Sequence, residues 1–126
     1  MSQVILLAED DKMIQRLLSR MIKRAGFQGE VAIHADSTSA LDFLEQTQDT
    51  VVLALMDTAL HPEGDKAFAL AIQARVPDIK LVASSGHSEA DLRGPNHFGD
   101  VGLAAVLSKP FGMQDVKDLL SSLGLA

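Results

Sequence analysis

The sequence contains no cysteine, no tryptophan and no tyrosine, and these absences exclude several classes of site. Without cysteine there is no disulfide, no thiolate nucleophile and no thiolate zinc site. Aromatic residues are only 4% of the chain while hydrophobic residues are 47%, so the core must be aliphatic. The formal net charge of −6 argues against direct binding of nucleic acid, whose phosphates attract basic proteins.

Long hydrophobic runs are also missing. No stretch approaches the roughly 20 apolar residues that a membrane-spanning helix needs. The first apolar run, residues 4–8, is too short for the core of a signal peptide and ends in acids. A length of 126 residues is close to the commonest domain size. We therefore expect a single soluble, cytoplasmic domain over residues 1–126 that does not bind membranes.

Apolar runs alternate with amphipathic stretches along the chain. The apolar runs predict buried strands at residues 3–8, 29–35, 50–56, 79–83 and 104–107. Spacings of three and four residues predict helices at 11–25, after Ser37 as N-cap, at 67–75, from Ser88 and at 113–123. Alternating strands and helices imply an α/β fold, (βα)5, with a parallel sheet and helices on both faces.

Polar side chains follow four of the predicted strands, at the point where each strand ends. Open α/β sheets bind ligands in the crevice at the carboxyl ends of their strands, so these side chains are expected to meet there. Several carboxylates, a hydroxyl and one ammonium suit Mg²⁺ together with a phosphoryl group. The set comprises Glu9, Asp10, Asp11, Asp57, Ser84, Ser85 and Lys109.

A helix N-terminus explains only part of this set. The helix dipole favours acids there by about 0.3–1 kcal/mol each, which accounts for one or two of the first three acids but not for Asp57. Two carboxylates about 4 Å apart repel by about 4 kcal/mol at an effective dielectric near 20, so a cluster of acids favours a bound cation. Taken singly, Lys109 and Ser85 also fit ordinary loop positions.

With these residues in order on a βα pattern, the sequence resembles the receiver domain of two-component response regulators, of the chemotaxis-regulator type. The resemblance covers nearly the whole chain. It implies a flavodoxin-like, doubly wound sheet of five parallel strands in the order 2-1-3-4-5. It also implies a Mg²⁺ site formed by Asp10, Asp57 and a backbone carbonyl, that of Ala59. Glu9 would act through a water molecule, and Asp11 could share the role.

The resemblance further implies that the domain is a phosphoacceptor. Asp57 would take a phosphoryl group from the phosphohistidine of a histidine kinase or a phosphotransfer domain, while Lys109 and Ser85 bind the phosphoryl oxygens. Positioning and charge stabilisation are what phosphoryl transfer requires of a protein. The domain would assist its own phosphorylation and slow autodephosphorylation without being an enzyme, and it would signal by a conformational change.

Two features depart from the family pattern. Val106 stands three residues before Lys109, where the family commonly has an aromatic residue that rotates during signalling. Gly94-Pro95 interrupts the fourth helix, because both residues are poor in a helix interior. The face that relatives use for partners, and for a homodimer, consists of the fourth helix, the fifth strand and the fifth helix. Its shape here does not follow from relatives.

Other functions compete with the phosphoacceptor. A pseudo-receiver would be a protein-interaction module that is never phosphorylated. An aspartyl phosphatase related to haloacid dehalogenases would use Asp57-Thr58, but that family has its nucleophile on the first strand. Zinc binding is disfavoured because the four histidines do not pair at i, i+4. Of these, His61 and His87 are candidates for controlling water access to the site.

Overall fold

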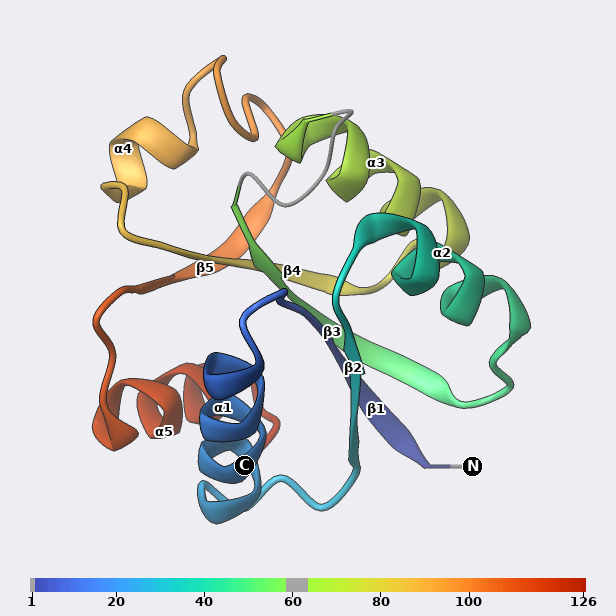
Figure 1. Ribbon diagram of the computed structural model, residues 1–126, viewed down its shortest axis with the longest axis vertical. Helices are drawn as coiled ribbons and strands as arrows, with labels where there is room; N and C mark the ends of the chain where they lie inside the picture. Colours follow the sequence, from blue (N-terminus) through green and yellow to red (C-terminus); the bar gives the residue numbers. More distant parts are fainter. Residues whose placement is uncertain (1, 59–63) are drawn as a thin grey trace.

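The computed structural model describes residues 2–58 and 64–126, in which strands and helices alternate as predicted (Figure 1). None of the described helices is long and apolar enough to cross a bilayer. The elements are β1 (Gln3–Ala8), α1 (Lys12–Arg24), β2 (Glu30–His34), α2 (Ser37–Gln46), β3 (Thr50–Asp57), α3 (Asp65–Arg75), β4 (Lys80–Ser85), α4 (Glu89–Leu92), β5 (Leu103–Ser108) and α5 (Met113–Ser122).

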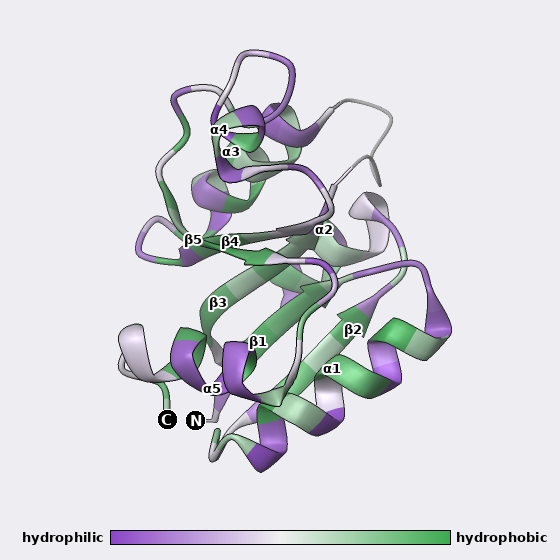
Figure 2. Cartoon of the chain, turned by 90° about the vertical axis from the view of Figure 1, so that its left-hand side faces the viewer, coloured by the Kyte–Doolittle hydropathy of each residue, from purple (hydrophilic) through white to green (hydrophobic). Residues whose placement is uncertain are grey.

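The strands form one parallel sheet in the order β2-β1-β3-β4-β5, which confirms the predicted flavodoxin-like topology. Helices α1 and α5 cover one face, and α2 and α3 cover the other (Figure 1). The central strands are among the most hydrophobic parts of the chain and lie between helices that carry both polar and apolar residues (Figure 2). Burial on both faces explains why β1 and β3 are apolar without alternation.

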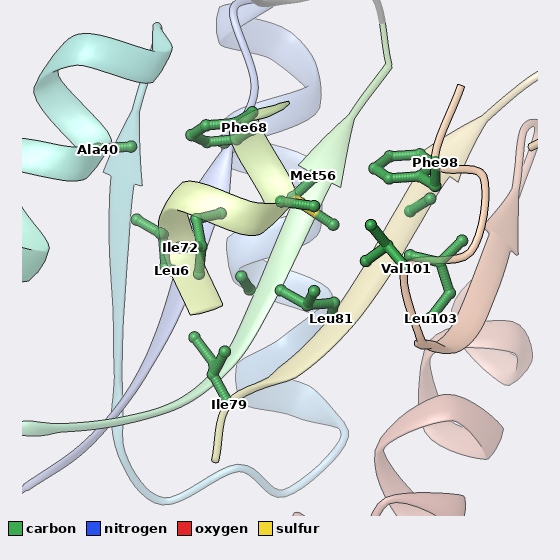
Figure 3. Packing of buried hydrophobic residues seen from close by; sticks show 14 of the residues in the cluster. Leu6, Ala40, Met56, Phe68, Ile72, Ile79, Leu81, Phe98, Val101 and Leu103 are labelled. Carbon is green, nitrogen blue, oxygen red and sulfur yellow. The ribbon is translucent and has the colours of Figure 1, made fainter. Parts of the chain in front are cut away.

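A hydrophobic core lies on each side of the sheet. On the side of α2 and α3, Phe68 and Ile72 pack with Phe98 against the strands (Figure 3). On the side of α1 and α5, Val116, Leu119 and Leu120 of α5 are buried. Most of both cores is aliphatic, as the scarcity of aromatic residues predicts.

The helix boundaries differ from the predictions in detail. Asp36, and not Ser37, caps α2, because the Asp36 carboxylate accepts the Ser39 N–H at 2.8 Å. Helix α4 is a single turn capped by Ser88, and residues 93–102 are irregular, as Gly94-Pro95 predicts. A short α4 leaves the connection from β4 to β5 to be made mainly by non-helical chain.

Candidate functional site

The register of the sheet brings the predicted residues to one edge. Asp57, the last residue of β3, pairs with Ser84 in β4, and Ser85 pairs with Ser108 in β5. The backbone N–H of Lys109 donates to the Ser85 carbonyl at 2.8 Å. The ends of β3, β4 and β5 therefore hold the acid, the hydroxyl and the lysine side by side.

Three carboxylates gather at this edge. Glu9, Asp10 and Asp57 each place an oxygen within 4.8 Å of the others. Asp10 is exposed, Asp57 is half-buried and Glu9 is buried. Oxygen donors of this kind fit a hard divalent cation such as Mg²⁺, which would offset their mutual repulsion.

Asp11 is placed differently from its neighbours. Its carboxylate caps α1 by accepting two backbone N–H groups of the first turn, at 2.9 and 3.3 Å. It does not belong to the group of three carboxylates found among the described residues. Ala59, whose backbone carbonyl is a predicted Mg²⁺ ligand, and His61 lie outside the described residues.

Glu9 is the most unusual acid of the group, with only 1% of its surface exposed. Its Oε2 accepts the Asp11 N–H at 3.1 Å, but its Oε1 has no hydrogen-bond partner among the described residues. Burial raises the pKa of the Glu9 carboxyl above its ordinary value. Asp57 adds to this rise, whereas the Asp11 N–H and Lys109 oppose it. An unsatisfied buried carboxylate oxygen next to two other acids is an observation that supports a cation site.

Lys109 supplies the positive charge of the site. Its Nζ lies 2.8 Å from Asp57 Oδ1 and 3.5 Å from Glu9 Oε1. Burial alone would lower the pKa of Lys109, but the hydrogen bond and charge of Asp57, with the charge of Glu9, raise it overall. The ammonium is therefore held in its charged form between two acids.

Replacing Lys109 with Met should destabilise the protein, because Glu9 and Asp57 would then face each other without a cation. Removing one partner of a buried ion pair costs about 3–5 kcal/mol. Since 26% of the Lys109 side chain is exposed, we expect a smaller loss, about 1–3 kcal/mol, in urea unfolding at neutral pH without divalent cations. Lys117→Met on the exposed surface of α5 is the matched control and should change stability little. A Lys109→Met variant as stable as this control would contradict the expected repulsion.

The hydroxyl of Ser85 is hydrogen-bonded on two sides. It accepts from Thr58 Oγ1 at 3.0 Å and from the His87 N–H at 3.0 Å. Sequence reasoning missed Thr58, although its position directly after Asp57 was a usable signal. Ser84 is also buried, but its Oγ has no hydrogen-bond partner among the described residues.

None of the histidines that the structure describes belongs to a group of three side chains close enough to share a metal ion. Among the described residues, the acidic cluster is the only group of three suitable side chains close enough to share an ion. The His87 and His97 rings instead contact each other in a tilted arrangement, with centroids 4.7 Å apart, and His34 packs on Phe43.

Comparison with known proteins identifies a matching family model and similar solved structures. Residues 5–121 match the family model described as the response regulator receiver domain. An uncharacterized protein from Neptuniibacter caesariensis is 28% identical, with a TM-score of 0.78 over 98% of this chain and 88% of that one. No curated protein matches the sequence.

Two further solved structures share the fold. The receiver domain of sensor histidine kinase PA1611 from Pseudomonas aeruginosa, with magnesium coordinated in its active-site cleft, is 23% identical. Its TM-score is 0.77, over 98% of this chain and 99% of that one. Chemotaxis protein CheY4 of Vibrio cholerae is 18% identical, with a TM-score of 0.78 over 98% of each chain.

Proposed function

Since this chain belongs to the family of response regulator receiver domains, we propose that it accepts a phosphoryl group on Asp57 from a phosphohistidine. The observation that supports this most directly is the 2.8 Å contact between Lys109 Nζ and Asp57 Oδ1, beside two further acids. A carboxylate held by a cation at the open edge of a sheet is positioned to attack an incoming electrophile.

The proposed reaction is an in-line displacement. A carboxylate oxygen of Asp57 attacks phosphorus, the bond from phosphorus to the imidazole nitrogen breaks, and the electron pair leaves on that nitrogen. Lys109 and the Ser85 hydroxyl bind the phosphoryl oxygens. The two hydrogen bonds that Ser85 accepts use both lone pairs of its oxygen and leave its own hydrogen to donate.

Mg²⁺ fits the same site. Asp10 and Asp57 would bind it, with Glu9 acting through water, and the carbonyl of Ala59 remains a prediction. When bound, the ion would neutralise charge on the phosphoryl oxygens and among the three acids. Glu9 Oε1 supports this assignment, because its 3.5 Å contact with Lys109 is an ion pair and it accepts no hydrogen bond from the described residues.

Incubation with acetyl phosphate and Mg²⁺, followed by intact-mass measurement, tests the proposal. One added phosphoryl group supports it, and an unchanged mass would favour the pseudo-receiver. A pseudo-receiver has no need of the ion pair between Lys109 and Asp57. Rapid turnover of external phosphoesters would instead indicate a phosphatase.

The surface next to the site offers a docking place for the phosphodonor. Ile14 and Leu17 of α1 line an apolar depression with Pro110 and Phe111, next to Lys109. Leu17 is 45% exposed and the neighbouring Met13 is 78% exposed. Helix α1 has no acid, and its basic residues are Lys12, Arg16, Arg20, Lys23 and Arg24. We therefore expect a donor, a histidine kinase or phosphotransfer domain, that presents apolar and acidic side chains.

Replacing Leu17 with Ser should slow phosphotransfer from a protein donor but not from acetyl phosphate. Burying a leucine side chain contributes about 1.5–3 kcal/mol, so we expect a loss of about tenfold or more in transfer rate. The donor is the fastest of a panel of purified autophosphorylated histidine kinases. Leu70→Ser, at a leucine of α3 that is 47% exposed, is the control. Equal slowing by both variants would refute docking at α1.

A homodimer through α4, β5 and α5 stays a prediction.

A further inference from the structure

Residues 93–102, here called the strap, replace most of the helix that would follow β4. The strap is packed and not loose: Phe98 and Val101 are buried in the core on the side of α3, together with Met56 and Leu81 (Figure 3). The Phe98 N–H also bonds the carbonyl of Leu92, at the end of α4, at 2.9 Å. These contacts hold the strap in position, so a structural change that alters them would also move the strap.

A partly buried hydrogen bond connects the strap to Asp65, the first residue of α3. His97 Nδ1 donates to Asp65 Oδ2 at 2.8 Å, with side chains 19% and 5% exposed. Figure 1 shows the strap next to the start of α3. A second contact, the ion pair between Lys66 and Asp100 at 2.8 Å, lies on the surface and contributes less to stability. The bond between His97 and Asp65 is thus the main polar link between the strap and α3.

His87 connects this link to the functional site. Its backbone N–H donates to Ser85 Oγ at 3.0 Å, and its ring packs on the His97 ring at 4.7 Å with an interplanar angle of 47°. Consecutive contacts therefore run from the Ser85 hydroxyl through His87 and His97 to Asp65. We call this series the histidine relay.

The aromatic residue that commonly rotates during signalling in this family, and that could respond to a movement of Ser85, is absent from its usual position in this chain. Val106 has no ring to rotate, and it lies partly buried against the core on the side of α3. In its two hydrogen bonds the Ser85 oxygen is the acceptor, so the hydroxyl can donate its own hydrogen to a phosphoryl oxygen. Because the His87 N–H is hydrogen-bonded to Ser85 Oγ, a shift of Ser85 Oγ toward the phosphoryl oxygen would also move His87.

We propose that the histidine relay transmits the phosphorylation state of the site to the strap and the start of α3. The proposal rests on the proposed phosphorylation of Asp57. When Ser85 turns toward the phosphoryl group, His87 moves with it, its ring shifts against His97, and the bond from His97 to Asp65 changes. Both ends of the relay are then coupled through contiguous contacts, and the strap presents a different surface to partners.

Nuclear magnetic resonance of the imidazole rings tests the relay in the whole chain. Beryllofluoride with Mg²⁺ mimics the phosphoryl group, and the ¹⁹F signal of the bound ligand reports occupancy of Asp57 independently. In the wild type we expect the ring resonances of His97 to shift on binding. In His87→Ala that shift should be lost while the ¹⁹F signal remains, and His87→Phe, which keeps a ring, should restore it.

His34→Ala is the matched control, because His34 also packs on a ring, that of Phe43, but is outside the relay. This variant should leave the His97 shift unchanged. A His97 shift that survives in His87→Ala, that is not restored in His87→Phe, or that is equally lost in His34→Ala would overturn the relay. Bound ¹⁹F signal without any His97 shift in the wild type would overturn the relay alone. Absence of bound ligand would overturn the proposed function as well.

Discussion

Replacing Asp57 with Asn is expected to abolish phosphorylation completely. The amide keeps the shape of the carboxylate but is not a nucleophile toward phosphorus, so no acyl phosphate can form. Wild-type protein incubated with acetyl phosphate and Mg²⁺ should gain the mass of one phosphoryl group, and Asp57→Asn should gain none. The effect is all or none because no neighbouring residue has the same position: Glu9 is buried and Asp10 is on the exposed side of the cluster.

Two control variants test whether the loss of phosphorylation is specific to Asp57. Asp78→Asn, at an exposed acid in the turn before β4, should gain the phosphoryl group like the wild type. Asp10→Asn should be phosphorylated more slowly, because the site loses a Mg²⁺ ligand but keeps its nucleophile. If Asp57→Asn still gains a phosphoryl group, another residue is the acceptor and the assignment of Asp57 is wrong.

The fold was predictable because its strongest signals are local. β1 and β3 are apolar on both faces, which only a sheet covered on both sides allows. The interruption at Gly94-Pro95 also followed from the residues themselves. The N-cap of α2 did not, because Asp36 and Ser37 are adjacent and both are good caps. The conformation of the first turn decides between them.

The meeting of Asp57, Ser85 and Lys109 at one edge was predictable, but their environment was not. Parallel strands bring their carboxyl ends to one edge, so these side chains were expected to meet. Which acid is buried depends on how the chain turns after β1: Glu9 lies inside and Asp10, the next residue, lies outside. The bond from His97 to Asp65 joins positions 32 residues apart, and no periodicity in the sequence signals it.

Replacing Glu9 with Gln is expected to stabilise the protein without Mg²⁺ at neutral pH. The pKa of Glu9 is raised above its ordinary value of 4.5, chiefly by burial, so the folded state disfavours the ionised form that predominates at pH 7. A neutral amide of the same shape avoids that cost. Asp57 still pairs with Lys109 at 2.8 Å, so the lysine keeps its closer partner. We expect a gain of about 1 kcal/mol in urea unfolding with a chelator present, the usual scale for an unsatisfied buried polar group.

The pH dependence and the response to Mg²⁺ separate this cause from a general gain in packing. A raised folded-state pKa means that the Glu9 contribution to wild-type stability is fully present below pH 4.5 and is lost as pH rises through the folded value. The advantage of Glu9→Gln should therefore be largest at neutral pH and should disappear as the wild type is acidified.

Asp10→Asn, at the exposed acid, should gain little stability without the ion. Binding of Mg²⁺ should stabilise the wild type more than either variant, because the ion replaces repulsion among three carboxylates by attraction. A Glu9→Gln variant that is less stable than the wild type at neutral pH would show that the contact of Glu9 with Lys109 outweighs its burial.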